Sequence, residues 1–244
     1  MRKIKEAYVV NNTLNPKLWD LDTLKLWPEV RSKIVNIVEQ FEDSLDVPIS
    51  ICDVHIVGSQ ANYNYSPHSD LDVHIIANFD IMSHDTELLR MLYDAKKARF
   101  NEKYSIKIRG IDVELYIEDV RTSVISNGIY SICEDKWIKK PIRNKLPPPP
   151  HIEKETANWI QAIGAACKSG TKDDIEDLIN RIYMMRKNSI AVDGEYGKGN
   201  LIFKAVRDAG SLDKLKDALY NIASKELSLE SLLSRGELVN LLED

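Results

Sequence analysis

The sequence has few cysteines and no apolar run long enough to cross a membrane. Its three cysteines, Cys52, Cys133 and Cys167, lie far apart and form no C-x-x-C pair. This spacing is typical of structural thiols in a reduced cytosolic protein and argues against a disulfide scaffold. No segment reaches the roughly 20 apolar residues of a membrane span, and the basic N-terminus lacks the apolar stretch of a signal peptide. We therefore expect a soluble cytoplasmic protein with no membrane contact.

The chain also lacks an excess of basic charge. It has 33 Lys and Arg against 38 Asp and Glu, a formal net charge of −5, and neither half is strongly basic. Proteins that hold duplex nucleic acid do so mainly by neutralising phosphates with basic side chains. The balance argues against a strong grip on duplex DNA and leaves open a short RNA end or a mononucleotide as ligand.

Four consecutive prolines, 147–150, mark the clearest boundary in the chain. Such a run favours stiff polyproline II structure. The residues before it mix helix and strand patterns, whereas those after it contain no convincing strand. With 244 residues and an ordinary apolar content, the chain can build two modest domains. We predict an α+β domain over 1–146, a proline linker over 147–150 and an α-helical domain over 151–244.

Hydrophobic periodicity predicts the elements of both domains. Apolar spacings of three and four favour helices over about 28–45 and 84–104. Short β-rich runs favour strands over 49–57, 71–77, 106–108 and 111–117, with a tight turn at Arg109-Gly110 and a further hairpin within 128–141. We also expect a turn or two of helix capped by Ser59, a strand or an arm over 1–15, and C-terminal helices over about 152–168, 172–188, 199–209, 211–223 and 228–242.

The segment VHIVGSQANYNYSPHSDLDVHII, residues 54–76, carries the most informative pattern. An apolar strand ends in Gly58-Ser59, where the missing glycine side chain lets backbone N–H groups and the serine hydroxyl approach a phosphate. Ten residues separate Ser59 from Asp70, and Asp70 and Asp72 open the next strand. Because residues at i and i+2 of a strand point to the same face, both carboxylates suit a Mg²⁺ ion shared with substrate phosphates. The segment predicts a phosphate-binding turn beside a divalent-metal site.

The order and spacing of these residues resemble the polymerase β-type nucleotidyltransferase superfamily, which has a hydrophobic-Gly-Ser turn followed by Asp-hydrophobic-Asp. Its members carry a third carboxylate on a later strand, and the run RGIDVELYIED (109–119) offers Asp112 and Glu114 on one strand face. Glu114 is the first choice because it lies deeper in the run, and Asp112 is the alternative. The segments LNPKLWD, GSQANYNY, ELYIED, GIYSICEDKWIKKP and GEYGKGNLIFKAVR are similar to predicted nucleotidyltransferases of tailed bacteriophages.

This resemblance implies a fold, a reaction and a set of ligands. The implied fold is a polymerase β-like palm, a mixed twisted sheet with helices, followed by an α-helical domain. The implied reaction transfers an NMP from an NTP, with ATP the expected nucleotide, to a hydroxyl of an RNA, a protein or a small molecule and releases pyrophosphate. The carboxylates named above would hold two Mg²⁺ (or Mn²⁺) ions, and Gly58 and Ser59 would bind the terminal phosphates. If a phage encodes the chain, the expected location is the host cytoplasm.

A glycine-rich loop precedes a predicted helix in the second domain, within GEYGKGNLIFKAVR (194–207). Such a loop at a helix N-terminus can bind an anion. The basic side chains that would then reach the triphosphate, from across an expected cleft between the two predicted domains, are Lys198, Lys204 and Arg207. An equally good interpretation is a connection between helices whose glycines permit tight packing.

His74 lies two residues beyond Asp72 and therefore shares its strand face. Mg²⁺ prefers oxygen ligands to imidazole nitrogen. We expect a hydrogen-bonded histidine beside the site rather than a metal ligand.

Two departures from better-known relatives narrow the function. Cyclic-dinucleotide synthases of this superfamily usually have Gly-Thr or a similar small pair soon after Gly-Ser, where this chain has QANYNYSPHS. The helix-hairpin-helix signatures with which the polymerases hold DNA are also absent. Both activities are disfavoured, and the alternatives are a catalytically silent nucleotide-binding sensor or a toxin–antitoxin-type interaction protein. The intact carboxylates favour an enzyme, because a silent relative has no chemical need for them.

Overall fold

The computed structural model describes residues 8, 10–83, 85–145 and 147–228. The chain divides into two compact units. The described residues of the sheet unit are 10–83, 85–145, 147 and 193–196, and those of the helical unit are 8, 148–192 and 197–228. The segment 193–196, which lies inside the domain predicted to be helical, thus belongs to the sheet unit. Residues 10–15 form no strand, and the helix predicted over 228–242 lies, apart from Ser228, outside the described residues.

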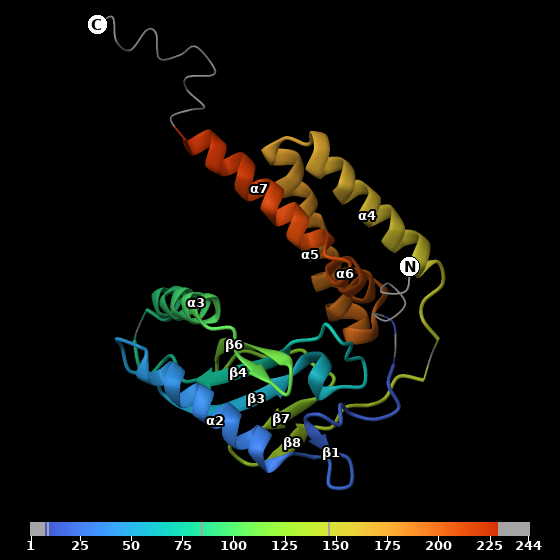
Figure 1. Ribbon diagram of the computed structural model, residues 1–244. Coiled ribbons are helices and arrows are strands. Elements are labelled where there is room, and N and C mark those ends of the chain that lie inside the picture. The colour runs from blue at the N-terminus through green and yellow to red at the C-terminus, as the bar shows by residue number, and fades with distance from the viewer. Residues whose placement is uncertain (1–7, 9, 84, 146, 229–244) are drawn as a thin grey trace, which may run out of the picture. The chain divides into compact units, whose positions relative to one another are not determined.

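A six-stranded mixed sheet forms the centre of the sheet unit (Figure 1), with the strand order β5-β6-β4-β3-β7-β8. β4 and β6 run parallel, and each of the other neighbouring pairs is antiparallel. The predicted α+β class, a mixed sheet with helices followed by a helical region, is confirmed. The strands are Ile51–Val57 (β3), Leu71–Ala77 (β4), Lys107–Ile108 (β5), Ile111–Asp119 (β6), Ile129–Ser131 (β7) and Lys136–Lys139 (β8).

A separate antiparallel pair joins Trp19–Asp20 (β1) to Lys25–Leu26 (β2). It was not predicted, because two-residue strands leave no periodic pattern in the sequence. Trp19 is completely buried and stacks on Trp137 of β8, with ring centroids 4.6 Å apart. This contact attaches the N-terminal part of the sheet unit to the edge of the main sheet.

Two helices pack against the main sheet, and both confirm the predicted periodicity. α2 spans Pro28–Asp43 and begins with a proline, whose fixed φ suits the first helical position. α3 spans Thr86–Lys103, and the Asp85 side chain caps it by accepting a backbone N–H at 2.9 Å. The helices meet where the rings of Phe41 and Phe100 pack edge to face, with centroids 5.2 Å apart.

The two faces of the sheet differ in character. Leu71, Val73 and Ile75 of β4 are completely buried in the cluster that contains the apolar side chains of α2 and α3. Because side chains alternate along a strand, Asp72 and His74 lie on the opposite face. The alternating sequence of β4 therefore separates the hydrophobic core from a polar face.

The edge of β6 is covered where the short strand β5 ends. The Nδ2 of Asn101 on α3 donates to the carbonyl oxygen of Leu115 at 3.0 Å, and its Oδ1 accepts the Leu115 N–H at 3.2 Å. This side chain takes the hydrogen bonds that a neighbouring strand would otherwise make. β5 and β6 are joined by the predicted turn at Arg109-Gly110, where both residues have positive φ, 50° and 81°, as a two-residue hairpin loop requires.

In the described residues after the prolines, 151–228, the chain forms four α-helices and a short 3₁₀ turn; Figure 1 labels these helices. The helices are Ile152–Ser169 (α4), Lys172–Asp193 (α5), Lys198–Asp208 (α6) and Ser211–Leu227 (α7), and the 3₁₀ turn η2 is Gly194–Tyr196. Ile163, Ile175, Ile182 and Val206 lie in the buried core of the helical unit. The four helices confirm the predicted ones, although α5 continues to Asp193 where we expected an end near 188, and α7 continues to Leu227 where we expected an end near 223. None of the described helices has both the length and the apolar character that crossing a membrane requires.

Candidate nucleotide and metal site

The Gly-Ser turn begins directly after β3 as a 3₁₀ turn, η1, that spans Gly58–Ala61. Gly58 has a φ of +67°, and a Cβ atom at this position would lie only 2.3 Å from the Oδ2 of Asp72. Glycine is needed for both reasons, the left-handed backbone and the close carboxylate. The prediction that Ser59 caps a helix here is wrong, because the 3₁₀ turn already starts at Gly58 and Ser59 lies within it. The cap position is Val57, which makes no side-chain cap.

The strand register brings Asp72 and Glu114 next to each other. Asp72 on β4 lies opposite Val57 on the β3 side and opposite Glu114 on the β6 side. Opposed residues of neighbouring strands share a face, so the two half-buried carboxylates lie side by side beside the Gly58 turn. Asp112 is exposed and accepts a hydrogen bond from the Nζ of Lys107 at 2.5 Å. The register favours Glu114 over Asp112 as the partner of Asp72.

Asp70 lies just before β4, after a turn closed by a hydrogen bond from the Ser69 N–H to the Ser66 carbonyl at 3.1 Å. Within the described part of the chain, no three Asp, Glu, His or Cys side chains gather closely enough to hold a metal ion. Mg²⁺, however, is commonly held by one or two carboxylates together with substrate phosphates. The pair Asp72 and Glu114 fits an ion whose coordination the substrate completes, and does not fit a closed protein cage.

Gln60 supports the turn through contacts that the sequence did not reveal. Its side chain is 1% exposed, donates to the Ser69 carbonyl at 2.9 Å and accepts from the Nδ2 of Asn15 at 2.9 Å. The backbone carbonyl of Gln60 accepts a hydrogen bond from the indole N–H of Trp19 at 2.7 Å. Gln60 therefore links the turn to the residue that precedes Asp70. The polar run QANYNYSPHS was the available signal, but the partner Asn15 is 45 residues away.

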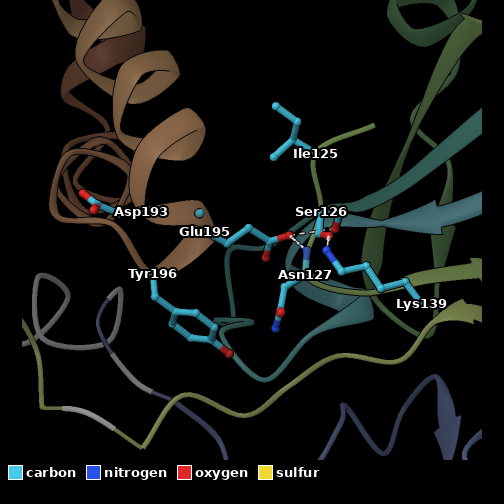
Figure 2. Close-up of a pocket in the computed structure, with 8 residues that line it drawn as sticks. Ile125, Ser126, Asn127, Lys139, Asp193, Glu195 and Tyr196 are labelled. Carbon is cyan, nitrogen blue, oxygen red and sulfur yellow. Dashed lines mark hydrogen bonds between the residues drawn. The ribbon is translucent and has the colours of Figure 1, made fainter. Parts of the chain in front are cut away.

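A second support holds Gly58 from the other side. The Gly58 N–H donates to the Oγ of Ser126 at 3.1 Å, and the Ser126 hydroxyl lies 2.7 Å from the Oε1 of Glu195. Glu195, in η2, is 8% exposed, and it also accepts from the Asn127 N–H at 2.9 Å and from the Nδ2 of Asn62 at 2.6 Å. Figure 2 shows the Glu195 side chain directed toward Ser126 and Asn127. Nothing local in the sequence indicated that Glu195 is connected to the Gly58 turn through Ser126.

His74 lies on the polar face beyond Asp72. It stacks on Tyr116 of β6, with ring centroids 4.7 Å apart, and its Nδ1 is 3.6 Å from the Oε1 of Glu118. Burial, followed by the charges of His55 and Lys97, lowers the pKa of His74 to about 4. His74 is thus a neutral, stacked side chain at pH 7. Its Nδ1 is buried and makes no hydrogen bond, so the predicted hydrogen bond is not found at this atom. The expectation that His74 is not a metal ligand stays a prediction.

Asp53 and His55 continue the polar face on β3. Burial alone would raise the pKa of Asp53, but hydrogen bonds from His55 and Ser131 and from backbone N–H groups lower it well below its ordinary value. The His55 Nε2 and the Asp53 Oδ2 are 3.0 Å apart. The Asp53 carboxylate therefore keeps its negative charge on the same face as Asp72.

The glycine-rich loop of the second domain leads into α6, whose cap is Gly197. A Cβ at Gly199 would lie 2.8 Å from the Met185 carbonyl oxygen on α5, so this glycine permits close helix packing. The Nζ of Lys198 pairs with the Oε1 of Glu155 at 2.5 Å. These contacts support the packing interpretation, and anion binding by the loop stays a prediction. Lys204 and Arg207 also lie on α6, in the helical unit, and their contact with a triphosphate likewise stays a prediction.

Comparison of the chain with protein-family models found no match, and comparison with curated protein sequences found none either. The function must therefore be inferred from the residues and geometry of the site.

Proposed function

We propose that the chain is a metal-dependent nucleotidyltransferase of the polymerase β type, which transfers an NMP from an NTP to a hydroxyl acceptor and releases pyrophosphate. One observation carries the proposal. The left-handed Gly58 turn lies against the carboxylate of Asp72, and the parallel register of β4 and β6 sets Glu114 beside Asp72. The turn to which we assign phosphate binding thus adjoins the paired carboxylates on one sheet face, and this proximity supports the proposal.

The pairing of Asp72 with Glu114 supports a cation at this position. Like charges directly opposite on neighbouring strands destabilise a sheet. Glu114 lies next to Asp72 across the parallel pair, so two carboxylates adjoin on one face. A divalent cation would relieve this repulsion, and hard cations prefer carboxylate oxygens.

Each residue of the candidate site then has a proposed role. The Ser59 hydroxyl and the backbone that follows Gly58 hold the terminal phosphates of the NTP. Asp70, Asp72 and Glu114 would hold Mg²⁺ or Mn²⁺, with Asp112 as the alternative third ligand. When bound, the ion lowers the pKa of the attacking hydroxyl and offsets charge at the α-phosphate. ATP is the expected nucleotide, and the acceptor is an RNA, a protein or a small molecule.

The test is a transfer assay with purified protein, each α-³²P-labelled NTP, Mg²⁺ or Mn²⁺, and separate pools of cellular RNA, protein and small molecules. We expect label on one pool with the wild type and with Asp22→Asn, which removes an exposed carboxylate in the turn between β1 and β2. Asp72→Asn should lose at least about 100-fold in rate, because it removes a group that stabilises the transition state. Equal labelling by Asp72→Asn and the wild type would refute the assignment.

A second candidate function is a nucleotide-binding sensor without turnover. The absence of a gathered three-ligand group among the described residues favours it. A sensor should be stabilised by an NTP with metal, because a ligand that binds only the folded state raises its stability. A protein that only docks to a partner should not respond. Metal-dependent stabilisation by an NTP without transfer to any pool would select the sensor.

A further inference from the structure

Glu195 is a buried carboxylate that belongs to the sheet unit although its neighbours in sequence are α5 and α6. Three donors converge on it, namely the Asn62 amide, the Ser126 hydroxyl and the Asn127 backbone N–H, at 2.6 to 2.9 Å. Figure 2 shows its side chain directed at Ser126 and Asn127. A buried carboxylate with this many donors is held firmly in one position.

The Ser126 hydroxyl connects Glu195 to the Gly-Ser turn. Its single proton can go either to the Glu195 Oε1 at 2.7 Å or to the Gly128 carbonyl at 2.8 Å. A carboxylate is the stronger acceptor, so the proton points to Glu195 and the Oγ lone pairs stay available for the Gly58 N–H at 3.1 Å. The Nζ of Lys139 donates to the Ser126 carbonyl at 2.6 Å and fixes the same residue from the other side.

We propose that Glu195 is a positioning residue which, through Ser126, holds the Gly58-Ser59 turn in the conformation that receives nucleotide phosphates. This inference rests on the proposed function. It also assigns the donors of the turn, because the Gly58 N–H is already bound to Ser126 and the phosphate contacts fall to Ser59 and the residues after it. The alternative is that Glu195 only holds η2 against the rest of the sheet unit and has no effect on the Gly58-Ser59 turn.

The choice of variants follows from the surroundings. A cavity of about 160 Å³ adjoins Glu195 and is lined by Ile125, Lys139 and Asp193 among others (Figure 2). Water in this cavity could replace a deleted carboxylate, so Glu195→Gln is better than Glu195→Ala. Glutamine keeps the shape but brings an amide donor toward a site where three donors already converge. Ser126→Ala removes the connecting hydroxyl and leaves the Asn62 and Asn127 contacts of Glu195 in place.

The matched control is Tyr196→Phe. It removes a hydrogen bond of the same segment, from the tyrosine hydroxyl to the Oδ1 of Asn62 at 2.9 Å, without touching the Ser126 connection. If η2 were only an attachment, this variant should disturb the turn as much as Glu195→Gln. If Glu195 instead acts on the turn through Ser126, Tyr196→Phe should leave the turn undisturbed.

The experiment measures hydrogen exchange of the Gly58 amide by NMR on the full chain, together with KM for the NTP and kcat. We expect Ser126→Ala and Glu195→Gln each to speed Gly58 exchange at least about tenfold and to raise KM about tenfold, with a smaller change in kcat. Tyr196→Phe should match the wild type. The double variant should exchange no faster than Ser126→Ala alone, because residues that act through one connection are not additive.

Unchanged Gly58 exchange in Ser126→Ala and Glu195→Gln would overturn the proposal, and so would faster exchange with an unchanged KM in an active protein. Equal effects of Tyr196→Phe and Glu195→Gln would also overturn it. Failure of the proposed function gives a different pattern. The wild type would then transfer no label from any NTP, while the exchange measurement would still report whether Glu195 holds the turn.

Discussion

At the scale of single residues, Gly58 combines a left-handed backbone with a contact that leaves no room for a side chain. Gly210 has nearly the same φ, +69°, but no atom lies within 4 Å of its would-be Cβ. Replacement of either glycine by alanine strains the backbone and costs about 1 kcal/mol of unfolding free energy. Only at Gly58 does the new methyl group also collide with Asp72.

We therefore predict that Gly58→Ala destabilises the protein by roughly 1–3 kcal/mol more than Gly210→Ala does, because overpacking adds to the backbone strain. Urea unfolding of both variants without ligand measures the difference. The nucleotide transfer rate should fall in Gly58→Ala alone, since Asp72 must move. Equal losses of stability in the two variants would show that Asp72 does not occupy the space beside Gly58.

His74 provides a prediction about pH. Its pKa is about 4 in the folded protein against 6.5 for an ordinary histidine. Between these values the unfolded chain binds more protons, so His74 lowers stability as the pH falls from about 6.5 to about 4, by on the order of 3 kcal/mol in total. Burial raises the pKa of Glu118, which opposes this loss in the lower part of the range.

The comparison of His74→Phe with the wild type isolates the histidine, because phenylalanine can still stack on Tyr116. We predict a flatter loss of stability between pH 6.5 and 4 in His74→Phe, measured by urea unfolding at several pH values. Parallel profiles for His74→Phe and the wild type would mean that His74 is not kept neutral.

At the scale of elements, the placement of Glu114 depends on how β6 is held. The Asn101 amide makes two hydrogen bonds with the backbone of Leu115, the residue after Glu114. We predict that Asn101→Ala lowers the free energy of unfolding by about 1–3 kcal/mol, because it leaves strand-edge groups without their partner. Glu102→Ala, at an exposed neighbouring position of α3, should change it by less than about 0.5 kcal/mol. Equal stabilities of the two variants would contradict this role of Asn101.

Much of the secondary structure could be predicted from sequence because its signals are local. The alternation along β4 and the spacings of α2 and α3 report which face is buried, whatever the partner. The tight turn at Arg109-Gly110 has a similarly local cause. Elements without such a signal were missed, namely the two-residue strands β1 and β2, and the end of α5 was placed too early.

The hydrogen bonds that hold the site residues in place could not be predicted, because their partners are distant in sequence. The N–H of Gly58 contacts Ser126, 68 residues away. Ser126 in turn contacts Glu195, a further 69 residues along the chain. Such contacts depend on the tertiary fold and leave no periodic pattern. The sequence ranked Glu114 above Asp112 only by its depth in the run, and the register that sets Glu114 opposite Asp72 could not be predicted.

At the scale of the whole molecule, the sheet unit contains Gly58, Ser59, Asp70, Asp72 and Glu114, and the helical unit contains the basic candidates of α6. The acidic residues can therefore be tested for metal binding without any assumption about Lys198, Lys204 or Arg207. The central claim is that Asp72 and Glu114 bind a divalent ion together with a nucleotide.

The most direct test is a titration of Mn²⁺ followed by EPR, with a non-hydrolysable NTP analogue present and no acceptor. We predict nucleotide-dependent Mn²⁺ binding by the wild type and by Asp112→Asn. We expect at least about tenfold weaker binding by Asp72→Asn and by Glu114→Gln, since each removes a carboxylate ligand. Equal Mn²⁺ binding by the wild type, Asp72→Asn and Glu114→Gln would contradict the central claim.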